Sequence, residues 1–284
     1  MKPSAFAYAR PRALEEAFAL LEKHGENAKL LAGGQSLLAS LNMRLAAPEI
    51  LVDIGAIPGL DGIALKGQAL VIGARATHRA IERSALVLKH APLLAQAAPH
   101  IAHVAIRNAG TLGGSLAMAD PAAEWPACCV ALQATISVAS RTGARRIPAA
   151  EFFKDLYTTA LGAGELITAV EFPCAEKDER HAFLELVRRR GDYAIVGLAA
   201  RAHAKGSTLS GVRLVYLGVG VTPVPAKAAM AALEGSTADE AALRAAQTAL
   251  DRDLAPGADL YTSAEAKRHM ARVLVARAVA ALLG

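Results

Sequence analysis

Cysteine is scarce in this chain, and its spacing excludes the common metal centres. The 284 residues contain three cysteines, Cys128, Cys129 and Cys174, and none forms the C-x-x-C or longer multi-cysteine pattern of an iron–sulfur cluster or a zinc site. We therefore expect no metal centre on this chain. Adjacent cysteines in an alanine- and valine-rich context point to different faces of a helix, so Cys128 and Cys129 are expected to be small buried residues.

Aromatic residues, long apolar runs and clusters of basic residues are also scarce. The longest uncharged run, residues 125–140, includes Gln133, Thr135 and Ser137 and is shorter than the ~20 apolar residues of a membrane-spanning helix. Residues 1–8 lack the apolar core of a signal peptide. The net charge of +5 is spread along the chain, and aromatics make up only 4%. We therefore expect a cytoplasmic protein with no membrane span and no nucleic-acid partner.

Hydrophobic residues, in contrast, make up 54% of the chain, and their spacing predicts a mixture of helices and strands. A charged cluster at residues 176–180 indicates a domain boundary. Helices are predicted over 11–24, 37–45, 77–84 and 92–98 and from residues 226 and 263 onward. Strands are predicted over 29–31, 50–54, 69–73, 135–139, 166–172, 183–188, 194–202 and 211–219.

Two glycine-rich loops, residues 32–36 (AGGQS) and 111–115 (TLGGS), are the main candidates for a binding site. The two adjacent phosphates of a dinucleotide need backbone N–H groups that approach without side chains in the way, which glycine permits. Ser36, Thr111 and Ser115 could add hydroxyl donors. One Gly-Gly pair beside a serine is an ordinary turn, but two such loops could bind one pyrophosphate between them. Neither loop fits G-x-G-x-x-G, so a Rossmann fold is disfavoured.

Other candidate residues keep two interpretations when they are considered by themselves. Glu124 could be a ligand or merely a charge at a helix start. Tyr193, in a Gly-Asp-Tyr turn, could present its ring to a flat heterocycle or be an ordinary strand tyrosine. His100 and His103 precede the second loop, but no further ligands lie near them in sequence, so we expect surface or capping histidines.

The segments around both loops resemble a known family. Residues 29–38 (KLLAGGQSLL) and 106–116 (IRNAGTLGGSL) are similar to the FAD-binding medium subunits of the molybdenum hydroxylases, which include carbon monoxide dehydrogenase, xanthine dehydrogenase and aldehyde oxidoreductase. The resemblance continues, in the same order, through residues 119–124 (ADPAAE), 164–167 (GELI) and 190–194 (RGDYA). It therefore covers nearly the whole chain.

This resemblance implies an α+β fold of the vanillyl-alcohol-oxidase (PCMH) type. Two α/β subdomains, residues 1–55 and 56–176, would hold FAD extended between them. Residues 177–284 would form a small C-terminal α+β domain with a three-stranded antiparallel sheet and helices.

The resemblance also implies roles for individual residues. Lys29 and Leu31 would lie by the adenosine, the two loops would bind the pyrophosphate, Glu124 would contact the ribityl hydroxyls, and Ile167 and Tyr193 would lie near the isoalloxazine ring. No catalytic or metal-ligating residue is expected. The cofactor-binding residues are then Lys29, Leu31, Ala32, Gly33, Gly34, Gln35, Ser36, Leu37, Thr111, Gly113, Gly114, Ser115, Glu124, Ile167 and Tyr193.

Two departures from the family limit this transfer. Glu185 stands where several relatives have lysine, so a contact from that position to the flavin is in doubt. Gln35 stands where carbon monoxide dehydrogenases typically have histidine, which weakens that substrate assignment. Because the first loop offers no His or Cys to bond to the ring, we expect non-covalent FAD.

The function implied is that of an electron-transfer subunit in an oxidoreductase complex. It would take electrons from [2Fe–2S] clusters on a small partner chain, with molybdopterin on a large partner chain, and pass them from FAD to an external acceptor. The assembly would be a dimer of heterotrimers. Two alternatives remain: a free-standing FAD-dependent oxidase or reductase, and a binding protein in which the loops are only turns.

Overall fold

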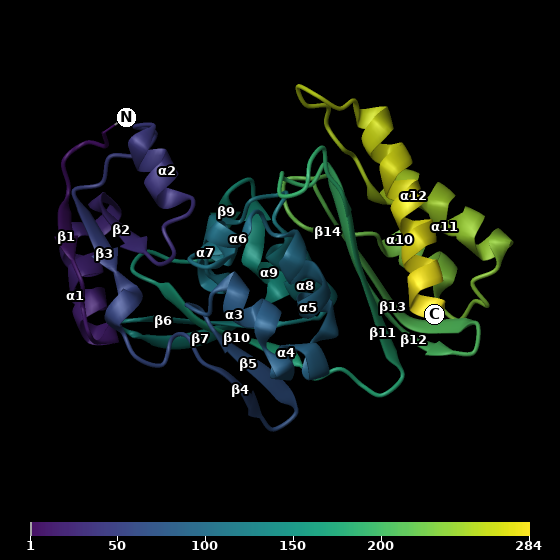
Figure 1. Ribbon diagram of the computed structural model, residues 1–284, viewed down its shortest axis with the longest axis horizontal. Coiled ribbons are helices and arrows are strands. Elements are labelled where there is room, and N and C mark those ends of the chain that lie inside the picture. The colour runs from purple at the N-terminus through teal and green to yellow at the C-terminus, as the bar shows by residue number, and fades with distance from the viewer. Residues whose placement is uncertain (1) are drawn as a thin grey trace.

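Three main β-sheets follow one another along the chain in the computed structural model, which describes residues 2–284 and also contains a small two-stranded sheet (Figure 1). The first sheet and its helices lie at one end of the molecule, and the second occupies the middle. The third lies at the other end, beside the C-terminal helices. This mixture of helices and separate sheets agrees with the predicted α+β class.

The first sheet is small and parallel, with the order β1-β3-β2. Parallel strands need crossover connections, and helices supply part of them here. Helix α1 buries Ala17, Phe18 and Leu21 at the predicted helical spacing, and it ends at Gly25, whose φ is +53°. The elements are β1 (Ala7–Ala9), α1 (Leu14–His24), β2 (Ala28–Leu31), α2 (Leu37–Asn42) and β3 (Ile50–Asp53), with 3₁₀ turns at Gly25–Asn27 and Ile54–Ala56.

The second sheet is antiparallel, with the order β4-β5-β10-β6-β7. The predicted strands at 69–73, 135–139 and 166–172 form its centre. Its strands are β4 (Ile63–Lys66), β5 (Ala69–Gly73), β6 (Thr135–Ser140), β7 (Gly143–Pro148) and β10 (Leu166–Pro173), and a separate hairpin joins β8 (Phe153–Asp155) to β9 (Thr158–Thr159). Its helices are α3 (His78–Arg83), α4 (Ala85–His90), α5 (Pro92–Ala97), α6 (Val104–Arg107), α7 (Leu112–Met118), α8 (Glu124–Ala131) and α9 (Ala149–Phe152), with a 3₁₀ turn at Ala98–His100.

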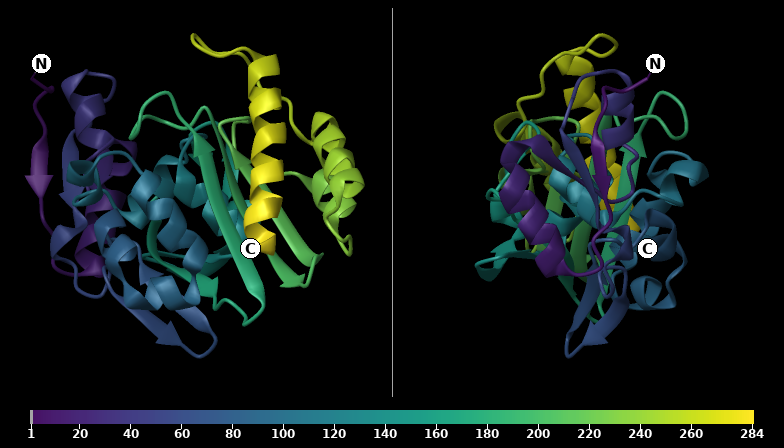
Figure 2. Two further views of the ribbon diagram at one scale, coloured as in Figure 1. Left: turned by 45° about the vertical axis from the view of Figure 1, so that its right-hand side comes forward. Right: turned by 90° about the vertical axis from the view of Figure 1, so that its left-hand side faces the viewer.

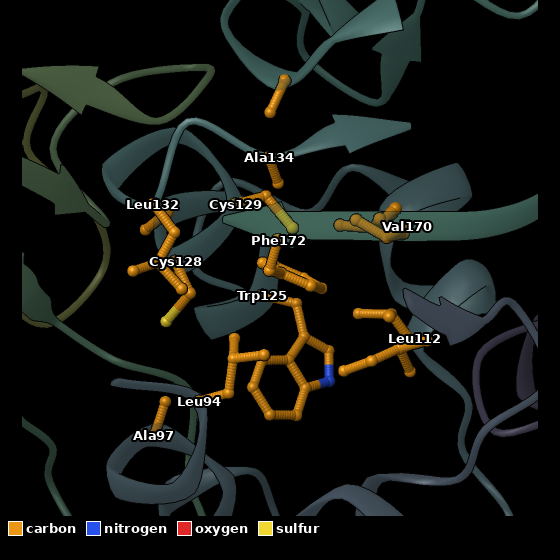
Figure 3. Close-up of a cluster of buried hydrophobic side chains, with 14 of the residues drawn as sticks. Leu94, Ala97, Leu112, Trp125, Cys128, Cys129, Leu132, Ala134, Val170 and Phe172 are labelled. Atoms are coloured by element: carbon orange, nitrogen blue, oxygen red, sulfur yellow. The ribbon is translucent and has the colours of Figure 1, made fainter. Parts of the chain in front are cut away.

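Helix α8 is buried in the core of this middle region (Figure 3). Trp125, the one tryptophan, is fully buried and lies near Leu112 of α7 and Phe172 of β10. Cys128 and Cys129 are also fully buried, and their thiols point to different sides of the helix. The prediction of small, buried cysteines is confirmed.

The third sheet has four strands in the order β11-β12-β13-β14, so the prediction of three was wrong. The extra strand pairs Val224 and Pro225 with Tyr216 and Val215. A two-residue edge strand that contains proline has no alternating pattern to detect. The elements are β11 (Glu179–Leu186), β12 (Val196–Lys205), β13 (Thr208–Leu217), β14 (Val224–Pro225), α10 (Lys227–Leu233), α11 (Glu240–Asp253) and α12 (Ala264–Leu283).

Helices cover both faces of this third sheet. Helix α12 lies across β11 and β12 on the outer face (Figure 2), and α8 packs on β12 and β13 from the middle region. Along β12, Leu198 and Ala200 belong to the outer core, whereas Ala199 belongs to the core of the middle region. The C-terminal part is therefore packed firmly against the rest. Within residues 2–284, no helix has the length and apolar character needed to span a membrane.

Candidate functional site

A cavity of about 610 Å³ lies between the first and second sheets and is bordered by both glycine-rich loops. Every predicted cofactor-binding residue except Leu31 borders it. On β2, Lys29 and Leu30 border the cavity and Leu31 does not. The volume lies within the range of small-molecule and cofactor sites, roughly 300–1,000 Å³.

The first loop presents a row of free amides. Among residues 2–284, no oxygen accepts a hydrogen bond from the backbone N–H groups of residues 33–37. Gly34 adopts a φ of +73°, and a Cβ on Gly33 would lie 2.2 Å from the carbonyl oxygen of Ala109. Gly33 is therefore needed for contact between the loop and residues 109–110, and Gly34 for the turn itself. Successive unpaired amides of this kind bind anionic oxygens.

The second loop is built differently from the first. The amides of Leu112 and Gly113 donate to the carbonyl oxygens of Ala76 and Ala74, and the amide of Gly114 donates to the Thr111 hydroxyl at 3.1 Å. A Cβ on Gly113 would lie 2.6 Å from the Cβ of Ala74. These amides hold α7 against the end of β5, so this loop offers the cavity its shape and its hydroxyl groups rather than a row of free donors.

Glu124 is buried at the start of α8 and borders the same cavity. Burial raises its pKa to about 8, and the negative charges of Glu185 and Asp120 add to that rise. At pH 7 the carboxyl is therefore mostly protonated. A neutral carboxyl can donate a hydrogen bond as well as accept one, which a carboxylate cannot.

The remaining predicted residues border other parts of the cavity. Ile167 on β10 is buried, whereas Tyr193 is 72% exposed. The turn before Tyr193 contains Gly191, whose φ is +90°, and a Cβ there would lie 2.5 Å from the ring of His103. The exposed His103 therefore packs under this turn.

Comparison with known proteins identifies the family. A family profile described as the FAD binding domain in molybdopterin dehydrogenase matches residues 4–175, and the CO dehydrogenase flavoprotein C-terminal domain matches residues 181–282. The chain belongs to the FAD-binding subunits of the molybdopterin dehydrogenases. The predicted family, the α+β fold with a C-terminal domain, and FAD as cofactor are confirmed.

Relatives of this flavoprotein align over nearly its whole length. It is 39% identical over 281 residues to the nicotine 6-hydroxylase medium subunit of Paenarthrobacter nicotinovorans, and this alignment covers 98% of each chain. It is 36% identical over 279 residues to the carbon monoxide dehydrogenase medium chain of Hydrogenophaga pseudoflava, covering 98% of this chain and 97% of that one. These relatives are subunits of oxidoreductases, and so is this flavoprotein.

Solved structures show the same fold. Carbon monoxide dehydrogenase from Hydrogenophaga pseudoflava superposes with a TM-score of 0.96 at 38% identity, covering 99% of this chain and 98% of that one. Quinoline 2-oxidoreductase from Pseudomonas putida 86 superposes with a TM-score of 0.95 at 36% identity, covering the same shares. The fold is therefore shared by family members that act on different substrates.

Arg107 is a structural residue of this flavoprotein's site to which the sequence assigned no role. It is buried, and its guanidinium donates to the carbonyl oxygens of Pro99, Ile101 and Ala102 and pairs with Glu82 at 3.1 Å. Ile101 and Ala102 border the cavity. Arg107 thus holds one wall of the site, and no sequence spacing indicates this because its partners lie on the turn before α6 and, 25 positions away, on α3.

Glu165 and His78 are two further residues on the cavity wall that the sequence missed. Glu165 lies within the GELI motif and accepts hydrogen bonds from Arg145 at 2.7 Å, which lower its pKa. His78 accepts a hydrogen bond from the indole N–H of Trp125 at 2.9 Å, and burial, together with the charge of Arg107, lowers its pKa to about 4. Both are held in place by residues that are distant in sequence.

Glu185 does not border the cavity. Its side chain is buried on β11, with one carboxylate oxygen 3.2 Å from Nδ1 of the half-exposed His100 and the other without a partner among residues 2–284. His100 is thus paired with an acid rather than free on the surface. No group of three or more His, Cys, Asp or Glu side chains in the described part of the chain is arranged to hold a metal ion.

Proposed function

We propose that this flavoprotein holds FAD non-covalently in the cavity between residues 32–36 and 111–115 and passes electrons through it. The observation that supports this most is the row of unpaired amides at residues 33–37, which borders the same cavity as Thr111. A pyrophosphate supplies the anionic oxygens that such donors bind. The residues present therefore fit the cofactor that the family uses.

The lining residues suggest how the cofactor would be oriented. With the pyrophosphate at the two loops, the adenosine would lie toward Lys29 and Leu30, and the flavin toward Ile167 and Tyr193. Glu124 would then face the ribityl hydroxyls, and its protonated carboxyl would donate to one of them. Tyr193 would cover the exposed edge of the flavin and limit its contact with water.

Non-covalent attachment is favoured by the side chains around the cavity. No cysteine borders it in the described part of the chain, and its one histidine, His78, has its Nδ1 lone pair occupied by Trp125. Denaturation and ultrafiltration should therefore release all of the flavin. Yellow colour that stays with the unfolded chain would contradict this assignment.

The role we propose for the chain is one step in a longer electron path. FAD, when bound, accepts electrons singly or in pairs, which suits a relay between one-electron clusters and an external acceptor. The clusters would lie on a small iron–sulfur chain and molybdopterin on a large chain, arranged as a dimer of heterotrimers. The relatives' names, which describe medium chains and complex subunits, support such an assembly.

Purification through a tag on this chain tests the assembly. If the flavoprotein is a subunit, a large and a small chain should co-purify with it from its own cells, and native mass spectrometry should give two copies of each. An isolated single chain whose flavin is reduced directly by a small substrate would instead support a free-standing oxidase or reductase.

The substitution Gly114→Val tests the location of the pyrophosphate. A Cβ at Gly114 would lie 2.9 Å from the Thr111 hydroxyl, and the added methyl groups would occupy space at the cavity wall. We expect the variant to lose its flavin absorption bands. Gly257→Val is the matched control, because a Cβ there meets nothing within 4 Å. Equal flavin content in the two variants would contradict the assignment.

A further inference from the structure

His78 is a buried polar side chain on the cavity wall. It is the first residue of α3, after the N-cap Thr77, and only 6% of it is exposed. Thr77 forms a β-bridge with Thr111, and the amide of His78 donates to the carbonyl oxygen of Gly110 at 2.9 Å. These two links fix His78 beside the second glycine-rich loop.

Trp125 determines which ring nitrogen of His78 carries the proton. An indole N–H can only donate, so Nδ1 of His78, 2.9 Å away, must be the acceptor. Burial, followed by the positive charge of Arg107, keeps the imidazole neutral at neutral pH. The single proton of a neutral imidazole then lies on Nε2.

The Nε2–H group donates to no acceptor within residues 2–284, and His78 borders the cavity. This edge of the ring lies over Gly110, since a Cβ on that residue would stand 2.7 Å from Nε2. The absence of a side chain at Gly110 therefore leaves room for the imidazole ring of His78. A donor that has no partner in the protein and belongs to a residue on the cavity wall is free to bind an acceptor of a ligand at this point.

We propose that the Nε2–H of His78 donates a hydrogen bond to a pyrophosphate oxygen of FAD, and that Trp125 is the positioning residue that fixes the tautomer. The inference rests on the proposed function, because it assumes FAD in this cavity. It adds a donor from a third segment, outside both glycine-rich loops. Its place beside Gly110 and Thr111 assigns it to the phosphate part of the cofactor rather than the flavin ring.

Two substitutions at His78 separate its two nitrogens. In His78→Asn the side-chain oxygen can stand near the position of Nδ1 and accept from Trp125, but no group reaches the position of Nε2. In His78→Gln an amide N–H can reach the position of Nε2, but the acceptor for Trp125 is lost. We expect FAD to bind about ten- to a hundredfold more weakly to His78→Asn, the loss of one hydrogen bond to a charged group.

The two variants should behave in opposite ways. His78→Gln should keep FAD affinity within about threefold of the unsubstituted chain but melt at a lower temperature, because the buried indole N–H is left unpaired. His78→Asn should melt closer to the unsubstituted chain. If both variants lose affinity equally, or neither does, the proposed hydrogen bond does not exist.

Resonance spectroscopy gives a readout that does not depend on affinity or activity. In the full chain labelled with ¹⁵N-histidine, the His78 signals should show a proton on Nε2 only and should move when FAD is added. At saturating FAD, the ³¹P signals of the bound pyrophosphate should differ between His78→Asn and the unsubstituted chain. Unchanged ³¹P signals would overturn the assignment to the phosphates, whereas failure of the unsubstituted chain to bind FAD would overturn the proposed function instead.

Discussion

The buried carboxyl of Glu124 makes a quantitative prediction about stability and pH. In the folded chain without flavin its pKa is about 8, compared with its ordinary value of 4.5, mainly because of burial. Between these two values the unfolded chain has released the proton and the folded chain has not. The stability that this group contributes is therefore fully present below pH 4.5 and is lost as pH rises toward about 8.

The size of this effect follows from the two pKa values. At about 1.4 kcal/mol for each pKa unit, the change from 4.5 to about 8 amounts to a loss on the order of 4 to 5 kcal/mol of unfolding free energy. In Glu124→Gln the side chain cannot ionise, so this loss should disappear. The stability of the variant relative to the unsubstituted chain should rise by several kcal/mol between pH 5 and pH 8.5.

Urea unfolding of the flavin-free chain at pH 5, 7 and 8.5 measures this difference directly. Comparison of variant and unsubstituted chain at each pH removes the contribution of all other titrating groups. Glu165→Gln is a control that should show no change across this range, because Arg145 lowers the pKa of Glu165 and the contribution of this carboxyl is lost only below its ordinary value of 4.5. If the Glu124→Gln difference is the same at pH 5 and pH 8.5, Glu124 ionises normally and the argument from burial is refuted.

Two further substitutions test the walls of the cavity. Gly33→Ala should cost about 1–3 kcal/mol of unfolding free energy and most of the FAD affinity, because its Cβ would lie 2.2 Å from the Ala109 carbonyl oxygen. Gly62→Ala is the control and should change neither quantity, because a Cβ there meets nothing within 4 Å. Equal melting temperatures of the two variants would refute the close contact at Gly33. Arg107→Met should lower the free energy of unfolding, measured in urea, by roughly 3 kcal/mol, because three carbonyl oxygens lose their hydrogen-bond donor. Glu82 keeps a partner, because Arg79 lies 2.9 Å away. A loss below about 1 kcal/mol would show that water replaces the guanidinium.

Much of the secondary structure and the location of the site could be predicted from local sequence patterns. The helical spacing of Ala17, Phe18 and Leu21 and the strands at 135–139 and 166–172 agree with α1, β6 and β10. The short strands β1 and β14 were not predicted. Strands of two or three residues gain their pairing from neighbours that are distant in sequence, so no periodic pattern marks them.

The chemistry of the site was only partly predictable. The two glycine-rich loops have nearly the same composition, yet only residues 33–37 keep free amides, because the amides of the second loop bond to Ala74, Ala76 and Thr111. Likewise, Glu124 could be a helix-end charge or a ligand, and its raised pKa arises from burial near Glu185 and Asp120. Composition does not show which polar groups have already found partners.

The sequence by itself determined the glycine-rich loops, the family and the absence of cluster-type cysteine spacing, because these depend on residue types at short separations. The tertiary structure decided how those loops differ and which distant residues complete the site. Trp125 bonds to His78 across 47 positions, and Arg107 pairs with Glu82 across 25. Such pairs form only when packing brings separate segments together in a buried, low-dielectric environment, where one hydrogen bond can fix a tautomer and burial can keep a carboxyl protonated.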